Sequence, residues 1–437
     1  MYLAIIGFAM VAVIVALLLK GKMSPIVVLI TIPTIAALLA GFGISDIGKF
    51  IVDGVKTTQN NAVLFIFSIT YFGIMTDVGL FDILVGKLVK KAGNNVIAIT
   101  VVTAIIAIMA HLDGSTACTV LITIPSMYPI YKRMNIRPYV LLLLTASAMG
   151  VMNLLPWGGP TARAATVLGM DANDLWLKLI PIQIVGVVVT LTLAVIMGII
   201  EKKRGAGLNA GSSDTVETAA AAEADKKAEE LKRPKLLWFN GLLTIGIIVS
   251  LVLNVVSSYV VFMMGTCIAL IVNYPSLKAQ DARFKAHAAS ALSIATTMLA
   301  AGAMVGVMEG TDMLSAMANV LISFIPEALG QYIHVIFGIF ALPMGMMIGT
   351  DAYFYGIMPL IIEVGTKYGV TALNTAMTMI IGKNVALMIS PLVPATFLAI
   401  GLVDVELKDH IRFSFKWLFG ISLVMLLAGF LLGVIQL

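Results

Sequence analysis

Polar residues interrupt four long apolar stretches of this chain, and their types are those that bind small ions. The interruptions fall at 111–116, 153–163, 349–351 and 384–396. Free backbone N–H groups at the start of a helix attract anions, whereas carbonyl and hydroxyl oxygens coordinate cations. Ionisable groups inside a membrane are costly and usually functional. These segments therefore predict the binding pocket of a small polar, anionic solute.

The charged residues at the interruptions indicate separate roles. Arg163 follows the string Pro-Trp-Gly-Gly-Pro, and its guanidinium can grip a carboxylate through two parallel hydrogen bonds; the alternative is an arginine that pairs internally or reaches to the membrane surface. Asp113 and Asp351 can bind a cation or accept a proton, or can cap the helix that follows. His111 is a candidate proton site, although a histidine beside a turn often serves only as a hydrogen-bonding partner.

Two of the interruptions contain prolines within apolar helices. They are Pro156 with Pro160 and Pro391 with Pro394. Proline removes a backbone donor and clashes with the preceding turn, so both helices are expected to break in mid-membrane. Non-helical backbone at that depth persists only where it is buried in protein or lines a wet cavity. The alternative is that these prolines only kink the helices for packing.

The amino-acid composition indicates that the helices carrying these residues lie in a lipid bilayer. Hydrophobic residues make up 60% and charged residues 12% of the 437 positions, whereas soluble domains average about 25% charged residues. We expect an all-α, multi-pass protein of the cell membrane with about ten transmembrane helices. The expected spans are 2–20, 24–43, 59–76, 138–169, 174–200, 236–256, 257–273, 287–307, 371–402 and 411–435. Two further segments, about 94–126 and 330–362, are expected to be re-entrant hairpins with polar tips.

The two halves of the chain repeat one order of features. The matched pairs, at a nearly constant offset, are Gly73 with Gly306, Asp113 with Asp351, and Asn153 with Asn384. We expect one repeat over 1–200 and another over 236–437, joined by a polar linker at 201–235. Five spans in each half make the second repeat inverted. Clusters of Lys and Arg then fall on the linker side, which predicts a cytoplasmic linker and two external termini.

Several functional classes lack their signatures. Neither GxxxxGK[ST] nor HExxH occurs, so ATP-driven pumping by this chain alone is not expected. Two cysteines are too few for a metal cage, and four histidines without metal-ligand spacing argue against an enzyme. The net charge of +5 is explained by clusters between spans, so no nucleic-acid partner and no cofactor are expected.

Three strings at these segments carry a resemblance to a known family. They are Pro156-Trp157-Gly158-Gly159-Pro160-Thr161-Ala162-Arg163, Leu112-Asp113-Gly114-Ser115-Thr116, and Tyr71-Phe72-Gly73-Ile74-Met75 with Asp77 and Gly79-Leu80-Phe81-Asp82. The chain resembles the citrate–metal–proton symporters (CitMHS), a branch of the ion transporter superfamily. The likeness runs over nearly the whole chain. The first string is the most specific of the three.

The resemblance implies secondary uptake of citrate complexed to a divalent cation, with protons cotransported. It also implies a homodimer in which a scaffold domain holds a moving, elevator-type transport domain built from the hairpins and broken helices. The metal would arrive with citrate as a co-substrate, so no dedicated metal site is expected, with Asp113 or Asp351 as the residues that face it. The alternative is a carrier of another di- or tricarboxylate or of an inorganic ion, coupled to sodium instead.

The family's substrate positions, carried over to matching residues, lie at the tips and breaks. They are Asp113, Gly114, Ser115, Thr116, Asn153, Gly158, Gly159, Thr161, Gly349, Thr350, Asp351, Asn384, Ser390 and Thr396. Arg163 is added on charge grounds. His111, Asp113 and Asp351 are the candidates for proton or cation coupling.

Overall fold

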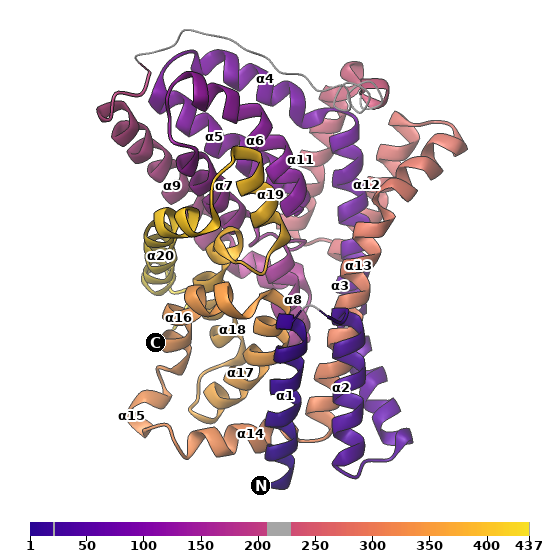
Figure 1. The fold of residues 1–437 in the computed structure, drawn as a ribbon. Coiled ribbons are helices and arrows are strands. Elements are labelled where there is room, and N and C mark those ends of the chain that lie inside the picture. The colour runs from indigo at the N-terminus through magenta and orange to yellow at the C-terminus, as the bar shows by residue number, and fades with distance from the viewer. Residues whose placement is uncertain (21, 208–228, 437) are drawn as a thin grey trace.

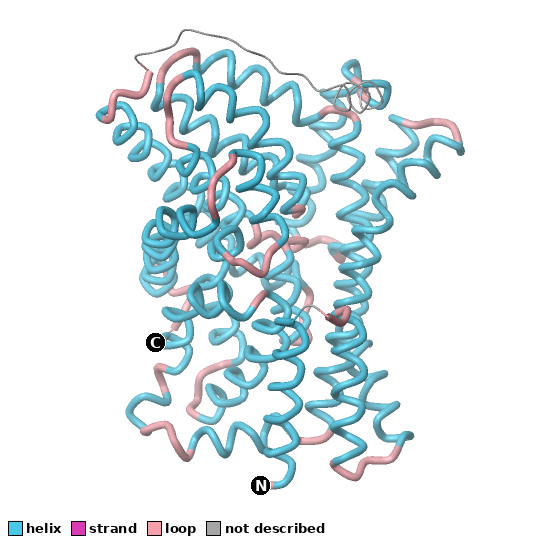
Figure 2. The backbone as a smooth tube through the Cα atoms, viewed as in Figure 1, coloured by secondary structure: helices cyan, strands magenta, loops and turns pink. Residues whose placement is uncertain are grey.

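Helices account for all regular structure in the part of the chain that the computed structural model describes, residues 1–20, 22–207 and 229–436 (Figure 1, Figure 2). The predicted all-helical fold is confirmed. Six stretches among these residues are long and apolar enough to cross a membrane. They are Val96–Asp113, Ala172–Lys203, Pro234–Leu253, Leu277–Gly310, Ala372–Ile389 and Leu407–Leu431. The multi-pass architecture follows, whereas the larger number of spans and the re-entrant course of the hairpins stay predictions.

One set of helices precedes the linker. They are α1 (Tyr2–Lys20), α2 (Pro25–Leu39), α3 (Ile44–Asp77), α4 (Leu80–Ala92), α5 (Val96–Ala110), α6 (Thr116–Arg133), α7 (Pro138–Met152), α8 (Gly159–Val167) and α9 (Ala172–Lys203). A 3-10 turn, His111–Asp113, separates α5 from α6. The helix predicted over 138–169 is therefore broken, as expected, between α7 and α8.

A second set of helices follows the linker, and the repeat predicted for the two halves stays a prediction. They are α11 (Leu237–Leu253), α12 (Ser258–Asn273), α13 (Leu277–Gly310), α14 (Met313–Ile322), α15 (Glu327–Gly330), α16 (Ile333–Ile348), α17 (Met358–Lys367), α18 (Ala372–Lys383), α19 (Pro394–Val403) and α20 (Leu407–Leu431). A π-helical turn, Ala352–Ile357, precedes α17, and a 3-10 turn, Asn384–Ile389, follows α18. The predicted break within 371–402 is thus present as well.

Helices α3 and α13 extend beyond the membrane spans predicted at 59–76 and 287–307, and these spans stay predictions. Each helix has 34 residues, or roughly 50 Å at 1.5 Å per residue. In α3 the extra turns are polar, and exposed ion pairs support them: Lys49 Nζ lies 3.3 Å from Asp46, and Lys56 Nζ lies 3.2 Å from Asp53. Pairs at this spacing stabilise a helix outside the apolar stretch, so hydropathy alone underestimated its length.

The α3–α13 crossing depends on glycines that let the two backbones touch. The helices run side by side in Figure 1. A Cβ on Gly54 would lie 2.1 Å from the carbonyl oxygen of Gly302, and one on Gly306 would lie 2.2 Å from that of Phe50. Small residues permit such close approach in membrane helices. The two helices therefore pack backbone to backbone at this crossing.

Left-handed residues recur at matching places in the two parts of the chain. Gly79 (φ 78°) precedes α4 and Asp312 (φ 58°) precedes α14. Gly114 (φ 70°) and Gly349 (φ 81°) mark the breaks after α5 and α16. Only glycine enters this region without strain. The positive-φ glycines of the two breaks are thus Gly114 and Gly349, whereas the sequence comparison paired Asp113 with Asp351; that pairing stays a prediction.

Both ends of the predicted linker 201–235 are docked, and the part at 208–228 lies outside the described residues. Glu201 is fully buried, and its carboxylate accepts hydrogen bonds from Arg137 Nε at 2.6 Å and Arg204 Nε at 3.0 Å. At the far end, Arg233 N donates to Val78 O at 3.0 Å, beside the α3–α4 turn. The polar linker predicted from the sequence is thus attached to the helices at both ends, by the Glu201 ion pairs and by the Arg233 backbone.

Candidate functional site

A cavity of about 510 Å³ lies among α3, α13, the two helix breaks and two turns, which we call the first tip (111–115) and the second tip (349–351). The predicted site residues that line it are Asp113, Gly114, Ser115, Thr116, Asn153, Gly159, Arg163, Thr350 and Asp351. Gly349 lines a neighbouring cavity of about 540 Å³, against the turn between α1 and α2. The remaining predicted residues, His111, Gly158, Thr161, Asn384, Ser390 and Thr396, do not line either cavity.

Local hydrogen bonds shape the first tip. Asp113 Oδ1 accepts from Ser115 N at 2.8 Å, and Ser115 Oγ caps α6 by accepting from Cys118 N at 3.3 Å. Gly114 supplies the left-handed residue between them. The turn ends α5 and starts α6 within a few residues, so the N-terminal end of α6 opens onto the cavity. The capping role considered for Asp113 is thus filled by Ser115, while Asp113 supports the turn and lines the cavity.

The first helix break is tied to the first tip by Trp157. Its Nε1 donates to Leu112 O at 2.7 Å, and its ring packs 5.1 Å from Phe72 and 5.0 Å from Phe262, centroid to centroid. Gly158 has no room for a side chain, because a Cβ would lie 2.3 Å from Asn153 O. Trp157 thus fixes the position of the α8 N-terminus relative to the tip.

Two predicted residues near this break are held by internal hydrogen bonds. Thr161 is fully buried, and its hydroxyl contacts the carbonyl oxygens of Asn153 and Leu154, both at 3.0 Å. His111 is also fully buried; its Nδ1 lies 2.6 Å from Thr119 Oγ1 and its Nε2 lies 3.1 Å from Asn153 Oδ1. Both side chains therefore position Asn153 and the break.

Arg163 and Asp351 form an ion pair across the cavity. The Arg163 Nε donates to Asp351 Oδ1 at 2.7 Å, and its Nη1 donates to Gly159 O at 3.0 Å. The two side chains are 17% and 23% exposed. The internal pairing considered for Arg163 is thus realised, while part of each charged group still faces the cavity.

The second tip and the second break bring buried polar groups together. Lys383 Nζ donates to Thr350 Oγ1 at 3.1 Å and lies 4.8 Å from the centre of the Phe354 ring. The side chain of Asn384 is buried, and neither of its polar atoms has a hydrogen-bond partner among the described residues. A buried amide without a hydrogen-bond partner lowers the free energy of unfolding by about 1–3 kcal/mol. The Asn384 side chain therefore does not serve stability.

The other two predicted residues of the second break stabilise its backbone. Ser390 Oγ donates to Met346 O at 2.8 Å and accepts from Leu392 N at 3.2 Å. Thr396 Oγ1 lies 3.5 Å from Leu387 O, within the first turn of α19. These hydroxyls hold the loop that presents Val393 and Pro394, at the start of α19, to the cavity.

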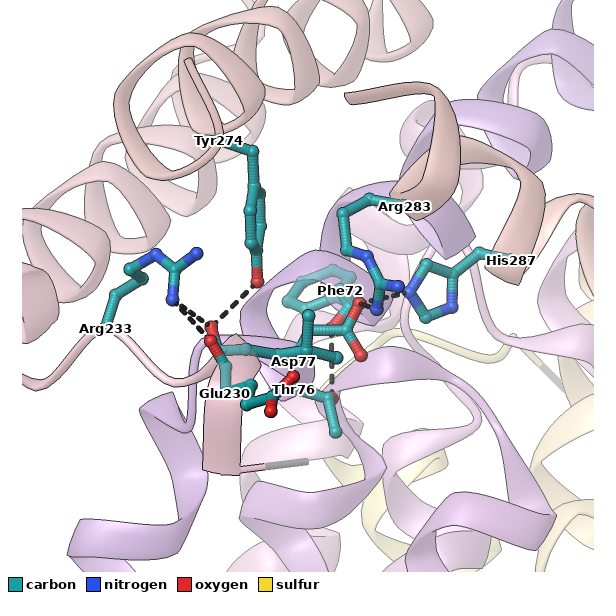
Figure 3. Close-up of polar contacts among 9 residues, drawn as sticks. Phe72, Thr76, Asp77, Glu230, Arg233, Tyr274, Arg283 and His287 are labelled. Atoms are coloured by element: carbon teal, nitrogen blue, oxygen red, sulfur yellow. Dashed lines mark hydrogen bonds and ion pairs between the residues drawn. The ribbon is translucent and has the colours of Figure 1, made fainter. Parts of the chain in front are cut away.

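Sequence reasoning missed the residues that α13 contributes. His287, Ser290 and Ser293 line the cavity, and His287 Nε2 lies 2.8 Å from Asp77 Oδ2 at the end of α3. Figure 3 shows Asp77 facing both His287 and Arg283. The spacing of these α13 residues was a usable signal, because positions three apart lie on one face of a helix.

No group of three or more His, Cys, Asp or Glu side chains suited to hold a metal occurs within 1–20, 22–207 and 229–436. The cavity instead collects helix N-termini. The starts of α6, α8 and α19 all contribute lining residues, and each N-terminus carries a partial positive charge. With Arg163, this arrangement suits a polyanion.

The sequence profile of the CitMHS family, described as citrate transporter, matches residues 1–382. The chain belongs to the CitMHS family. Two Bacillus subtilis (strain 168) relatives are a "Citrate transporter", 38% identical over 99% of this chain and 100% of that protein, and a "Mg(2+)/citrate complex secondary transporter", 39% identical over 99% of each. CitMHS membership points to a membrane transporter rather than an enzyme.

A solved structure supports the fold of this CitMHS chain. The Alcanivorax borkumensis YdaH transporter aligns with a TM-score of 0.59, covering 88% of this chain and 87% of that one. The sequences are 14% identical, so the likeness concerns architecture alone.

Proposed function

We propose that this protein is a secondary transporter that imports citrate as a complex with a divalent cation, coupled to protons. The observation that carries the proposal is the meeting of three helix N-termini and Arg163 on one cavity. Its volume, about 510 Å³, falls in the range of roughly 300–1,000 Å³ common for small-molecule sites. A relative described as a "Mg(2+)/citrate complex secondary transporter" supports the choice of substrate.

The chemistry of a metal–citrate complex divides the cavity residues into two groups. Carboxylate oxygens not bound to the metal would accept from Arg163 and from the backbone N–H groups at Thr116 and Gly159. A hard cation prefers oxygen ligands, so Asp113 or Asp351 would face the metal side. The cation is then a co-substrate that citrate itself holds.

The predicted site residues outside the cavity receive a supporting role in this proposal. His111 and Thr161 hold Asn153 and its backbone, and Ser390 and Thr396 hold the loop before α19. Gly158 permits the tight turn before α8, and Gly349 starts the second tip. We assign Asn384 a role in another conformation of the transporter, in which the solute or a cation contacts its unpaired amide.

We further propose an elevator mechanism in a homodimer. The two repeats, 1–200 and 236–437, would each supply one tip and one break to a moving body, while α3 and α13 belong to a fixed scaffold. The inverted arrangement would place the linker 201–235 in the cytoplasm and both termini outside. The contact of Tyr128 Oη with Val403 O at 2.9 Å, which joins α6 to α19, supports a single body made from both halves.

Uptake by proteoliposomes tests the proposal. Accumulation of labelled citrate should rise with a divalent cation outside and with an inward proton gradient. Citrate together with its preferred cation should also raise the melting temperature of the purified protein, because a ligand that binds only the native state stabilises it. Uptake of free citrate driven by sodium without a metal effect would contradict the proposal, and stronger competition by another carboxylate would favour the alternative substrate.

A further inference from the structure

A histidine–carboxylate pair lies beside the cavity, and its histidine is part of the cavity wall. His287 on α13 lines the cavity, and its Nε2 lies 2.8 Å from Asp77 Oδ2 at the end of α3. Arg283 Nη1 donates to the same oxygen at 3.2 Å (Figure 3). The His287 and Asp77 side chains are 21% and 17% exposed. The pair is therefore shielded but within reach of the cavity.

The geometry defines where a proton can bind. A carboxylate accepts from Nε2–H, so the neutral ring keeps Nδ1 as its acceptor. Nδ1 lies over Gly73, where a Cβ would be only 2.4 Å away, and Gly73 also lines the cavity. A proton added at Nδ1 gives an imidazolium whose Nε2–H still donates to Asp77. No rearrangement of the pair is needed.

The other histidines in the described part of the chain have different surroundings. His111, His334 and His410 are fully buried, and their ring nitrogens contact Asn153, the carbonyl of Gln436 and the carbonyl of Met388, respectively. None of these three lines the cavity. His287 differs because it combines a carboxylate partner with a place on the cavity wall.

A polar track leads along α13 to this pair. Ser290 and Ser293 follow His287 at helical spacing, are exposed and line the same cavity. Their hydroxyls can hydrogen-bond water in the cavity whose wall also contains His287. The wall also changes charge on protonation, since Asp77 and Arg283 balance each other and the imidazolium adds a positive charge beside the anion's cavity.

We propose that His287, held by Asp77, is the residue that binds the cotransported proton. The inference rests on the proposed proton-coupled uptake and names the carrier of its proton, in place of His111, Asp113 or Asp351. Other charged or titratable groups near the pair are Arg283, Asp113, Cys118, Arg233 and Tyr274, with Arg163 and Asp351 elsewhere on the cavity wall.

The test measures citrate uptake and proton influx in the same proteoliposomes, loaded with a pH-sensitive dye. His287→Gln keeps an N–H donor for Asp77 but cannot take the proton. We expect the number of protons carried per citrate to fall to near zero and the acceleration by an inward proton gradient to be lost, whatever the change in the rate of citrate–Mg²⁺ exchange at equal pH. His334→Gln, which removes a histidine away from the cavity, should behave as wild type. Wild-type proton influx in His287→Gln would overturn the inference.

A second variant keeps the inference testable if His287→Gln does not fold. Asp77→Asn replaces the carboxylate that accepts from His287 Nε2 at 2.8 Å with a neutral amide, so the number of protons carried per citrate should fall. An unchanged number of protons per citrate in this variant would overturn the assignment. If the wild-type protein itself shows no citrate-dependent proton influx, the proposed proton coupling is wrong. If influx persists in both variants, the coupling stands and only the assignment of the proton to His287 is wrong.

Discussion

Arg163 and Asp351 neutralise each other, so removing one leaves an unpaired charge in a largely enclosed place. We expect Arg163→Ala to lower stability by about 3–5 kcal/mol, the usual effect of breaking a buried pair, and to abolish citrate uptake. The double variant Arg163→Ala/Asp351→Ala removes both charges and should recover most of the melting temperature. If Arg163 also grips the substrate, the double variant folds but still does not transport.

The comparison of single and double variants separates two roles for Arg163. Thermal unfolding reports the pairing, and proteoliposome uptake reports the substrate contact. Uptake near the wild-type rate in the double variant would show that Arg163 only balances Asp351. The sequence could identify both residues as unusual charges but not as partners, because 188 positions separate them.

Asn384 and Asn153 follow α18 and α7 at matching places, yet their surroundings predict opposite effects of substitution. Neither polar atom of Asn384 has a partner among the described residues, so Asn384→Leu should raise stability by about 1 kcal/mol while abolishing uptake. Asn153→Leu strips His111 Nε2 of its contact at 3.1 Å and should lower stability by about 1–3 kcal/mol. Thermal unfolding without substrate measures both effects on stability. A lower melting temperature for Asn384→Leu would contradict the prediction that its unpaired amide is destabilising.

At the scale of elements, the α3–α13 crossing should tolerate no added atoms. Gly306→Ala would place a methyl group 2.2 Å from the backbone oxygen of Phe50, and a backbone atom cannot turn away as a side chain can. We expect a loss of about 1–3 kcal/mol, typical of overpacking, in thermal unfolding. Gly246→Ala on α11 is the matched control, since nothing lies within 4 Å of its Cβ position. Equal melting temperatures would contradict the role of the crossing.

Helices and helix breaks could be predicted where the sequence has a long apolar stretch or a proline within one. The breaks at 153–158 and 384–393 followed from prolines, and the breaks at the two tips from polar residues in apolar stretches. The sequence analysis missed helices α4 and α14, because helices of 13 and 10 residues are too short to be recognised as membrane spans from hydropathy. The length of α3 was missed because its first turns are polar and exposed, which hydropathy does not count as helix.

At the scale of the whole molecule, the proposed moving body and scaffold should respond differently to substrate. Amides at 111–116 and 384–393 lie at helix interruptions, where local opening is easiest. Citrate with Mg²⁺ should slow hydrogen exchange there. Exchange around Gly54 and Gly302, in the interlocked crossing, should not change. A uniform slowing over both regions would argue against a local binding site between two bodies.

For the whole molecule, the sequence could predict the order of the elements along the chain but not how they pack in space. The sequence indicated two similar halves and four interruptions, but the convergence of α6, α8 and α19 on one cavity depends on contacts between residues far apart. The pair of Asp77 and His287, 210 positions apart, shows the same limit. Neither residue is unusual for its own stretch of sequence, so no local pattern could join them.

The docked ends at 201–207 and 229–235 have a consequence for how the chain can be made. Gly207 N donates to Met134 O at 2.8 Å, and Arg233 N donates to Val78 O at 3.0 Å, so each end keeps its anchor without relying on 208–228. Two separately translated polypeptides, divided within 208–228, should therefore assemble in one membrane and co-purify as an active complex. Arg233→Ala, which removes the contacts of that side chain with Asn273 O and Glu230 O, should weaken this complementation more than it affects the undivided chain.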